Sequence, residues 1–206
     1  MRMILLCLAL AACSTADAGP SVMEPRKLDA FTGLDVSTIL DVEVTIGSPA
    51  KVEVRGPQEW VARLSTKVVK GVLVASMPGK WDNMPTLKLV ITTPSLTSAS
   101  LSGVVTLKAA KLAGKAFDLD ISGVGTVVLA GAVDTFHVES SGAGSLDAQK
   151  LVTSTTAIEL SGAGEATVHA TKQLDVSLSG AGSITAYGKP ATIHKSISGV
   201  GELALR

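Results

Sequence analysis

The sequence predicts an all-β fold, a single-stranded parallel β-helix with a period of about 18–20 residues per coil. Ser-Gly followed by Val or Ala occurs six times in the second half of the chain, and in five copies a second glycine follows. The copies begin at Ser102, Ser122, Ser141, Ser161, Ser179 and Ser198, so the spacings are 20, 19, 20, 18 and 19 residues. Self-similarity at this period is typical of a solenoid of stacked coils. Because connections between parallel strands are usually right-handed, we expect a right-handed helix.

Apolar residues recur at every second position on both sides of each Ser-Gly pair. This period of two indicates strands whose alternate side chains point into one core. Phe117 and Phe136 hold equivalent inward positions in successive coils and are expected to stack there. Ser140 and Lys195 interrupt the apolar pattern in their coils.

The repeated Ser-Gly pair predicts a sharp corner between two strands. Glycine reaches the left-handed backbone region at little cost, so we expect positive φ at corner glycines such as Gly162 and Gly180. The Val or Ala between the glycines is expected to point inward. The serine hydroxyls are expected to bond backbone groups at the turn rather than to act as nucleophiles, because six equivalent serines cannot all be catalytic.

Residues 26–100 are strand-like but less regular. Strands are predicted over residues 41–46, 51–55, 68–75 and 87–92, with a short helical piece at residues 58–64. We interpret residues 26–100 as irregular opening coils and residues 101–206 as regular coils of one domain, residues 26–206. A separate small β-domain packed on the end of the rod stays open as an alternative.

The amino terminus predicts export. A positive start is followed by a short apolar run and by Leu10-Ala11-Ala12-Cys13, so residues 1–12 are expected to be a signal peptide. This segment resembles a bacterial lipoprotein signal, which implies that Cys13 receives a lipid and that Ser14 directs the protein to the outer membrane. Residues 13–25 are then a tether that holds the domain off the lipid bilayer. An ordinary secretory signal is the alternative.

Composition excludes several classes of partner. The chain has 18 basic and 18 acidic residues and zero formal net charge, so no nucleic-acid partner is expected. Aromatic residues make up 3% of the chain, which argues against stacking platforms for bases or sugars. The two cysteines, Cys7 and Cys13, both lie in the signal region, so no disulfide is expected in the folded domain.

One family resemblance follows from the order of these motifs. Three motifs follow one another along the chain: Leu40-Asp41-Val42-Glu43-Val44, the run Leu87 to Pro94, and the repeated Ser-Gly turns that begin at Leu101-Ser102-Gly103. Together they resemble the bacterial GIN-domain family, the head domains assigned to autotransporter adhesins. The resemblance covers about residues 29–206 and implies a β-helical envelope protein that is secreted or lipid-anchored.

Few residues suggest chemistry, and no catalytic or cofactor-binding residue is expected. Asp120, Glu139 and Glu159 hold the second position before three successive serines, so they predict an outward acidic ladder that could share a metal cation. The alternative is a solvated acidic row on a strand. His137 and His194 hold equivalent positions in coils too far apart to ligate one ion, and we interpret them as surface residues.

These observations predict a non-enzymatic, lipid-anchored envelope protein with an adhesin-like domain that binds an unknown protein or glycan. A periplasmic scaffold or sensor that binds another protein is the alternative, and a polysaccharide-acting β-helix enzyme is a further one. A solenoid exposes a strand edge and core at its ends. The inward residues Leu203 and Leu205 therefore predict a homo-oligomer through the carboxy-terminal coils.

Overall fold

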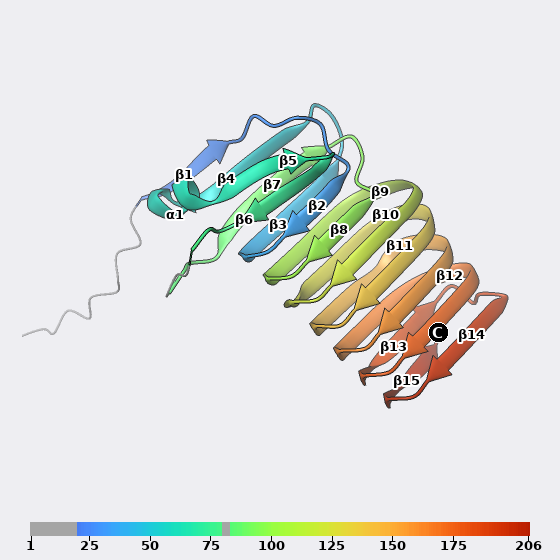
Figure 1. Cartoon of the computed structure of the whole chain (residues 1–206). Coiled ribbons are helices and arrows are strands. Elements are labelled where there is room, and N and C mark those ends of the chain that lie inside the picture. The colour runs from blue at the N-terminus through green and yellow to red at the C-terminus, as the bar shows by residue number, and fades with distance from the viewer. Residues whose placement is uncertain (1–19, 80–82) are drawn as a thin grey trace, which may run out of the picture.

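A computed structural model describes residues 20–79 and 83–206 as a rod of two facing β-sheets whose coils stack along one axis (Figure 1). The post-corner sheet holds the strands that follow each Ser-Gly corner, and the pre-corner sheet holds those that precede it. The post-corner order is β1 (Ser21–Pro25), β4 (Lys51–Pro57), β7 (Leu87–Thr93), β3 (Ile39–Ile46), the first halves of β9 (Val104–Ile121), β10 (Val124–Ser140), β11 (Ala143–Leu160) and β12 (Ala163–Leu178), then β13 (Ala181–Tyr187) and β15 (Val200–Leu205). The pre-corner order is β5 (Ser65–Val69), β6 (Val72–Ser76), β2 (Gly33–Val36), β8 (Ser98–Leu101), the second halves of β9 to β12, and β14 (Thr192–Ile197).

The regular coils pair in parallel, which confirms the predicted all-β parallel solenoid. Each of β9 to β12 crosses from one sheet to the other at a second corner, opposite the Ser-Gly corner. The register shifts there, for instance between Leu129 and Gly131 of β10 and between Asp147 and Val152 of β11. The second corner therefore absorbs the differences in coil length, and the Ser-Gly corner stays in register.

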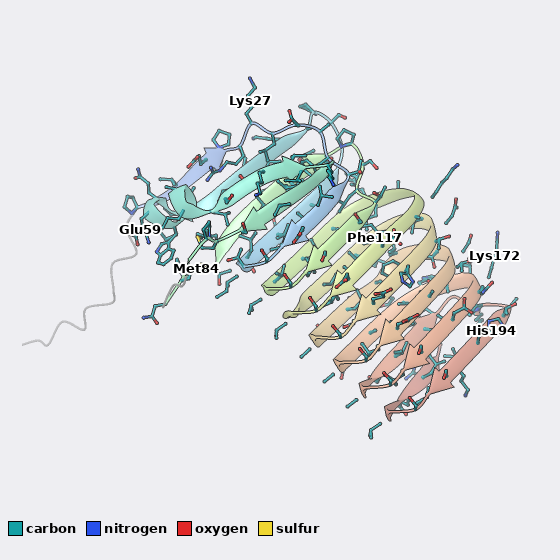
Figure 2. The ribbon with its side chains drawn as sticks, viewed as in Figure 1. Lys27, Glu59, Met84, Phe117, Lys172 and His194 are labelled. Atoms are coloured by element: carbon teal, nitrogen blue, oxygen red, sulfur yellow. The ribbon has the colours of Figure 1, made fainter. Side chains whose placement is uncertain are left out.

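The inward columns form one continuous hydrophobic core, as the alternation predicts. Phe117 (Figure 2) and Phe136 are fully buried between the sheets. Their ring centroids lie 6.0 Å apart, with an interplanar angle of 26°. The next coil places Thr156 in this column. The Thr156 hydroxyl lies 2.7 Å from that of Thr153, which also donates to the His169 carbonyl oxygen, so this buried polar pair is satisfied.

The corner glycines are required by close packing, and the prediction of positive φ at Gly162 and Gly180 is wrong. A Cβ atom on Gly162 would overlap the carbonyl oxygen of Gly142, and one on Gly180 would overlap that of Gly162. The same carbonyl oxygens accept hydrogen bonds from the next coil: the Ala163 N–H donates to Gly142 at 3.0 Å. Successive corners thus lie so close that the backbone of one coil fills the place of the next coil's Cβ.

The Val or Ala that follows the Ser-Gly pair points outward, which corrects the second prediction for the corner. Val104, Val124 and Val200 are 53%, 55% and 82% exposed. Of the serine hydroxyls, those of Ser102 and Ser161 donate to the carbonyl oxygens of Val36 and Ser140.

The upstream segment extends both sheets and closes one end of the rod. Its strands include antiparallel pairs that the sequence did not predict: β4 lies beside β7, and β5 beside β6. The helix α1 (Gln58–Arg63) buries Val61 against this end, with Leu64 after it, and Trp60 packs on the same core. These apolar side chains cover core that a terminal coil would otherwise expose.

Part of the predicted tether is ordered. Ser21–Pro25 form β1, which pairs antiparallel with β4, because Val22 packs on the core and the strand bonds to the edge of β4. The predicted signal peptide, Cys13 and Trp81 lie outside the described residues. No helix in the described ranges is long and apolar enough to cross a membrane.

We predict that Gly162→Ala lowers the free energy of unfolding by about 1–3 kcal/mol, because the new methyl group must displace the Gly142 carbonyl. Gly47→Ala is the matched control, since its Cβ would meet only the Thr92 methyl group at 3.6 Å. Urea unfolding of both variants measures the difference. Equal stability of the two variants would contradict the close-packing account.

Candidate functional site

The outer surface of the pre-corner sheet carries the predicted acidic ladder. Glu139 pairs in register with Asp120 on one side and Glu159 on the other, so the three carboxylates stand on neighbouring strands, about 4.8 Å apart. All three are exposed. Backbone pairing alone sets this spacing, because residues at equivalent places in successive coils must stack.

A second column of polar residues runs beside the ladder, two residues earlier in each strand. His137 pairs in register with Asp118, and His194 with Asp175. The His194 ring nitrogen Nδ1 lies 2.7 Å from Asp175 Oδ1, at the far end of the rod (Figure 2). The two histidines lie in different coils with Ala157 and Asp175 between them, as the sequence predicts. We name these two columns, from β9 to β14, the acidic face.

The acidic face is nearly free of cations that could balance its carboxylates. The two columns hold five carboxylates and no lysine or arginine: Asp118, Asp120, Glu139, Glu159 and Asp175. Two of the five contact a histidine, because His137 Nε2 lies 3.0 Å from Glu139 Oε1 and His194 bonds to Asp175. On the post-corner sheet, Glu43 and Glu53 are instead paired with lysine or arginine. Lys88 Nζ, 2.7 Å from Glu43 Oε1, lowers the pKa of Glu43, and hydrogen bonds from Lys51 and Arg55 lower the pKa of Glu53.

Shallow hollows follow the acidic face along the rod. One of about 170 Å³ lies over the three ladder carboxylates and the neighbouring serines. Another of about 430 Å³ lies where β8 places the small residues Ser98 and Ser100 beside Asp118 and Asp120. Within the described residues, no group of three His, Cys, Asp or Glu side chains could hold a metal ion. The exposed carboxylates of the ladder offer a row of hydrogen-bond acceptors, and their sharing of a cation stays a prediction.

Other predicted residues lie apart from the acidic face. Cys13 is outside the described residues. Leu203 is half-buried and Leu205 is 54% exposed in β15, which pairs with β13, and the proposed oligomer contact stays a prediction. One further corner, Ser37-Thr38 between β2 and β3, has no glycine and so was not predicted; it stacks beneath Gly103.

We predict that Glu159→Gln raises the free energy of unfolding by about 0.2–1 kcal/mol, because like charges opposite one another destabilise a sheet. The gain should shrink in high salt, which screens exposed charges. Glu165→Gln is the control, since Glu165 pairs in register with Ser145 and Ser183. Urea unfolding at low and high salt measures both. A salt-independent change, or an equal change in the control, would contradict repulsion within the ladder.

Comparison with solved structures identifies the same architecture in other bacteria. A putative adhesin from Bacteroides fragilis superposes with a TM-score of 0.73 at 22% identity, over 91% of this chain and 97% of that one. A putative adhesin from Parabacteroides distasonis gives a TM-score of 0.55 at 18% identity, over 91% and 98% of the two chains. One from Parabacteroides merdae gives 0.54 at 16% identity, over 91% and 97%. At these identities the likeness establishes the fold alone.

Comparison with protein families is more specific, although no curated protein matches the chain. The profile of the family described as "Putative auto-transporter adhesin, head GIN domain" matches residues 30–190. This range begins in the segment before β2 and extends past β13, so it takes in the upstream strands from β2 onward and all but the last of the regular coils. With most of its length matched, the chain belongs to the GIN-domain family of adhesin heads.

Proposed function

We propose that this protein is a non-enzymatic, adhesin-like binding protein of the bacterial cell envelope that contacts a basic surface of a partner protein through its acidic face. The observation that carries the proposal is the row of exposed carboxylates, held in register on a sheet face whose two columns contain no lysine or arginine. Exposed charge of one sign attracts a partner of the opposite sign and orients it. The family and the adhesins of similar fold support this role.

The repetition of the acidic face supports binding rather than catalysis. An active site brings different groups together at one point, whereas here similar groups recur from coil to coil along the rod. A partner that spans several coils can meet many equivalent carboxylates. The scarcity of aromatic side chains favours a protein partner over a glycan.

Neutralising the ladder should abolish capture of the partner. Asp120→Asn/Glu139→Gln/Glu159→Gln removes three charges from the acidic face, and Asp41→Asn/Glu165→Gln/Glu202→Gln removes three exposed charges from the post-corner sheet. We predict that the wild type and the control triple variant both cross-link to the partner protein and that the ladder variant does not. Added salt should weaken the capture by the wild type. Mass spectrometry identifies the captured protein.

The outcomes of this experiment separate the candidate functions. A captured host-surface protein supports adhesion, and a captured envelope protein of the same bacterium supports the scaffold or sensor alternative. Capture that both triple variants retain would overturn the role of the acidic face. Turnover of a polysaccharide would overturn the non-enzymatic proposal.

We further propose that the chain is anchored to the outer membrane through a lipid on Cys13. The support is the lipobox Leu10-Ala11-Ala12-Cys13 and the ordered strand β1, which begins eight residues later at Ser21. We predict that mass spectrometry of the protein extracted from membranes finds acylated Cys13 as its first residue, and that Cys13→Ala prevents acylation. A chain cleaved elsewhere and unmodified would contradict the anchor.

A further inference from the structure

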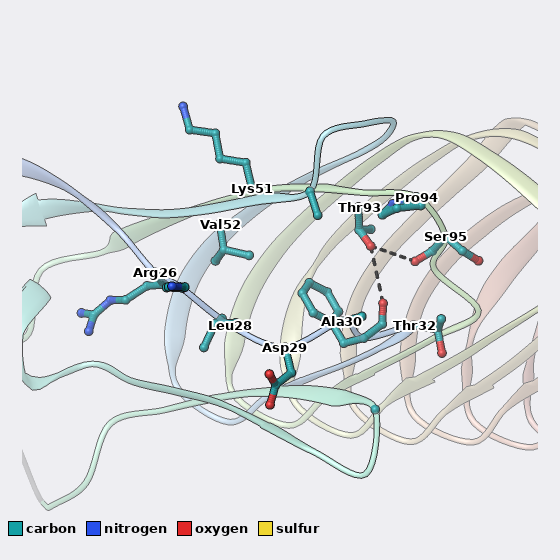
Figure 3. Close-up of a pocket in the computed structure, with 14 residues that line it drawn as sticks. Arg26, Leu28, Asp29, Ala30, Thr32, Lys51, Val52, Thr93, Pro94 and Ser95 are labelled. Carbon is teal, nitrogen blue, oxygen red and sulfur yellow. Dashed lines mark hydrogen bonds between the residues drawn. The ribbon is translucent and has the colours of Figure 1, made fainter.

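An apolar pocket opens between the two sheets near the amino-terminal end of the rod, away from the acidic face (Figure 3). It lies where the two sheets are joined by irregular connections rather than by regular second corners, one of them residues 94–97 between β7 and β8. The chain from β3 to β4 turns back within the post-corner sheet, and that from β5 to β6 turns back within the pre-corner sheet. The gap is crossed by residues 26–32, which we name the strap, on their way from β1 to β2.

The strap is attached mainly at its two ends. The Arg26 N–H donates to the Val52 carbonyl oxygen at 2.8 Å, and the Thr32 N–H donates to Gly71 at 2.9 Å. Between these points, Thr93 Oγ1 lies 3.5 Å from the Phe31 carbonyl oxygen (Figure 3). A segment held chiefly at its ends can shift to admit a ligand at lower cost than a strand within a sheet.

The walls of the pocket are mostly apolar. Leu28 and Phe31 of the strap and Val52 of β4 line it, and all three pack on the hydrophobic core. The buried Thr93 hydroxyl is satisfied by the carbonyl oxygens of Phe31 and Ser95. The volume of about 480 Å³ lies in the range of small-ligand sites and accommodates about sixteen non-hydrogen atoms.

Cations outnumber anions around the pocket. Its lining includes Arg26, Lys27 and Lys51 but one acid, Asp29. Two of the cations are engaged, because Arg26 bonds to Glu24 and to the Val61 carbonyl oxygen, and Lys51 bonds to Glu53. Lys27 makes no ion pair with any described residue, and it extends from the strap into solvent (Figure 2).

We infer that this pocket binds a single-chain amphiphile with an anionic head, of the chemical class of a fatty acid. The hydrocarbon chain enters between the sheets against Leu28, Phe31 and Val52, where burial of apolar surface drives binding. The carboxylate remains at the mouth beside Lys27.

Calorimetric titration of the purified exported protein with saturated fatty acids of about eight to sixteen carbons tests the inference, with each ligand below its aggregation limit. We expect saturable binding of one ligand per protein. Affinity should rise about fourfold for each added methylene group until the pocket is full, and then level off. Absence of saturable binding for every chain length would overturn the inference.

Two pairs of variants locate the site. Leu28→Asp should weaken dodecanoate binding at least tenfold, because it places a carboxylate in the apolar mouth, whereas Leu205→Asp in the last coil should have no effect. Lys27→Glu should weaken dodecanoate binding about three- to tenfold and leave dodecan-1-ol, which has no charge, unchanged. Lys172→Glu, at an exposed second-corner position far along the rod, is its control.

Hydrogen exchange gives a readout that does not depend on how well a variant folds. In the wild type, dodecanoate should slow exchange of the backbone amides in the strap and leave those of β13 and β15 unchanged. Protection elsewhere, or binding that Leu28→Asp and Leu205→Asp affect equally, would place the ligand outside this pocket and overturn the inference. The acidic-face triple variant should bind dodecanoate normally, so the two proposals fail independently.

Discussion

The close approach of successive Ser-Gly corners is the constraint on which the rest of the rod depends. Where one corner follows another, the carbonyl oxygen of the earlier glycine both occupies the place of the later Cβ and accepts a hydrogen bond from the next coil. Any side chain beyond hydrogen there would push the coils apart along the axis. Because the corners stay in register, the inward columns meet to form one core and the outward columns align as ladders. The acidic face is thus a product of backbone stacking, not of a special local fold.

The regular coils and the upstream segment differ in structure and in the kind of surface they form. The regular coils repeat one backbone solution and display similar groups at equal intervals on a flat surface. The upstream segment departs from it, with antiparallel strands, a helix and a strap, and these irregular elements close one end of the core. Departure from the repeat also replaces the regular second corners with the strap and the connection from β7 to β8, which both line the apolar pocket. The repeated acidic face and the enclosed pocket therefore lie in different parts of one chain.

The regular half of the fold could be predicted because its signals are local and repeated. Alternation of apolar residues placed Phe117 and Phe136 together, and the spacing of the serines placed Asp120, Glu139 and Glu159 in register. The reason for the glycines was predicted wrongly. A positive φ and the close approach of another coil both select glycine, so the sequence alone does not distinguish them. The upstream topology could not be predicted, because a strand such as β7 inserts between β3 and β4 through contacts that no local pattern encodes. The strap pocket depends on that topology and was missed for the same reason.

The register shifts at the second corner bear on how such a rod changes length during evolution. Gains or losses of one or two residues are tolerated there, because the strands already slip past one another between Asp147 and Val152. The Ser-Gly corner allows no such slippage, so larger changes must come as whole coils. Duplication or loss of a coil preserves the core and lengthens or shortens the rod in steps of about 4.8 Å. Descendants of one ancestral rod would then differ in reach by integer numbers of coils while keeping the same cross-section.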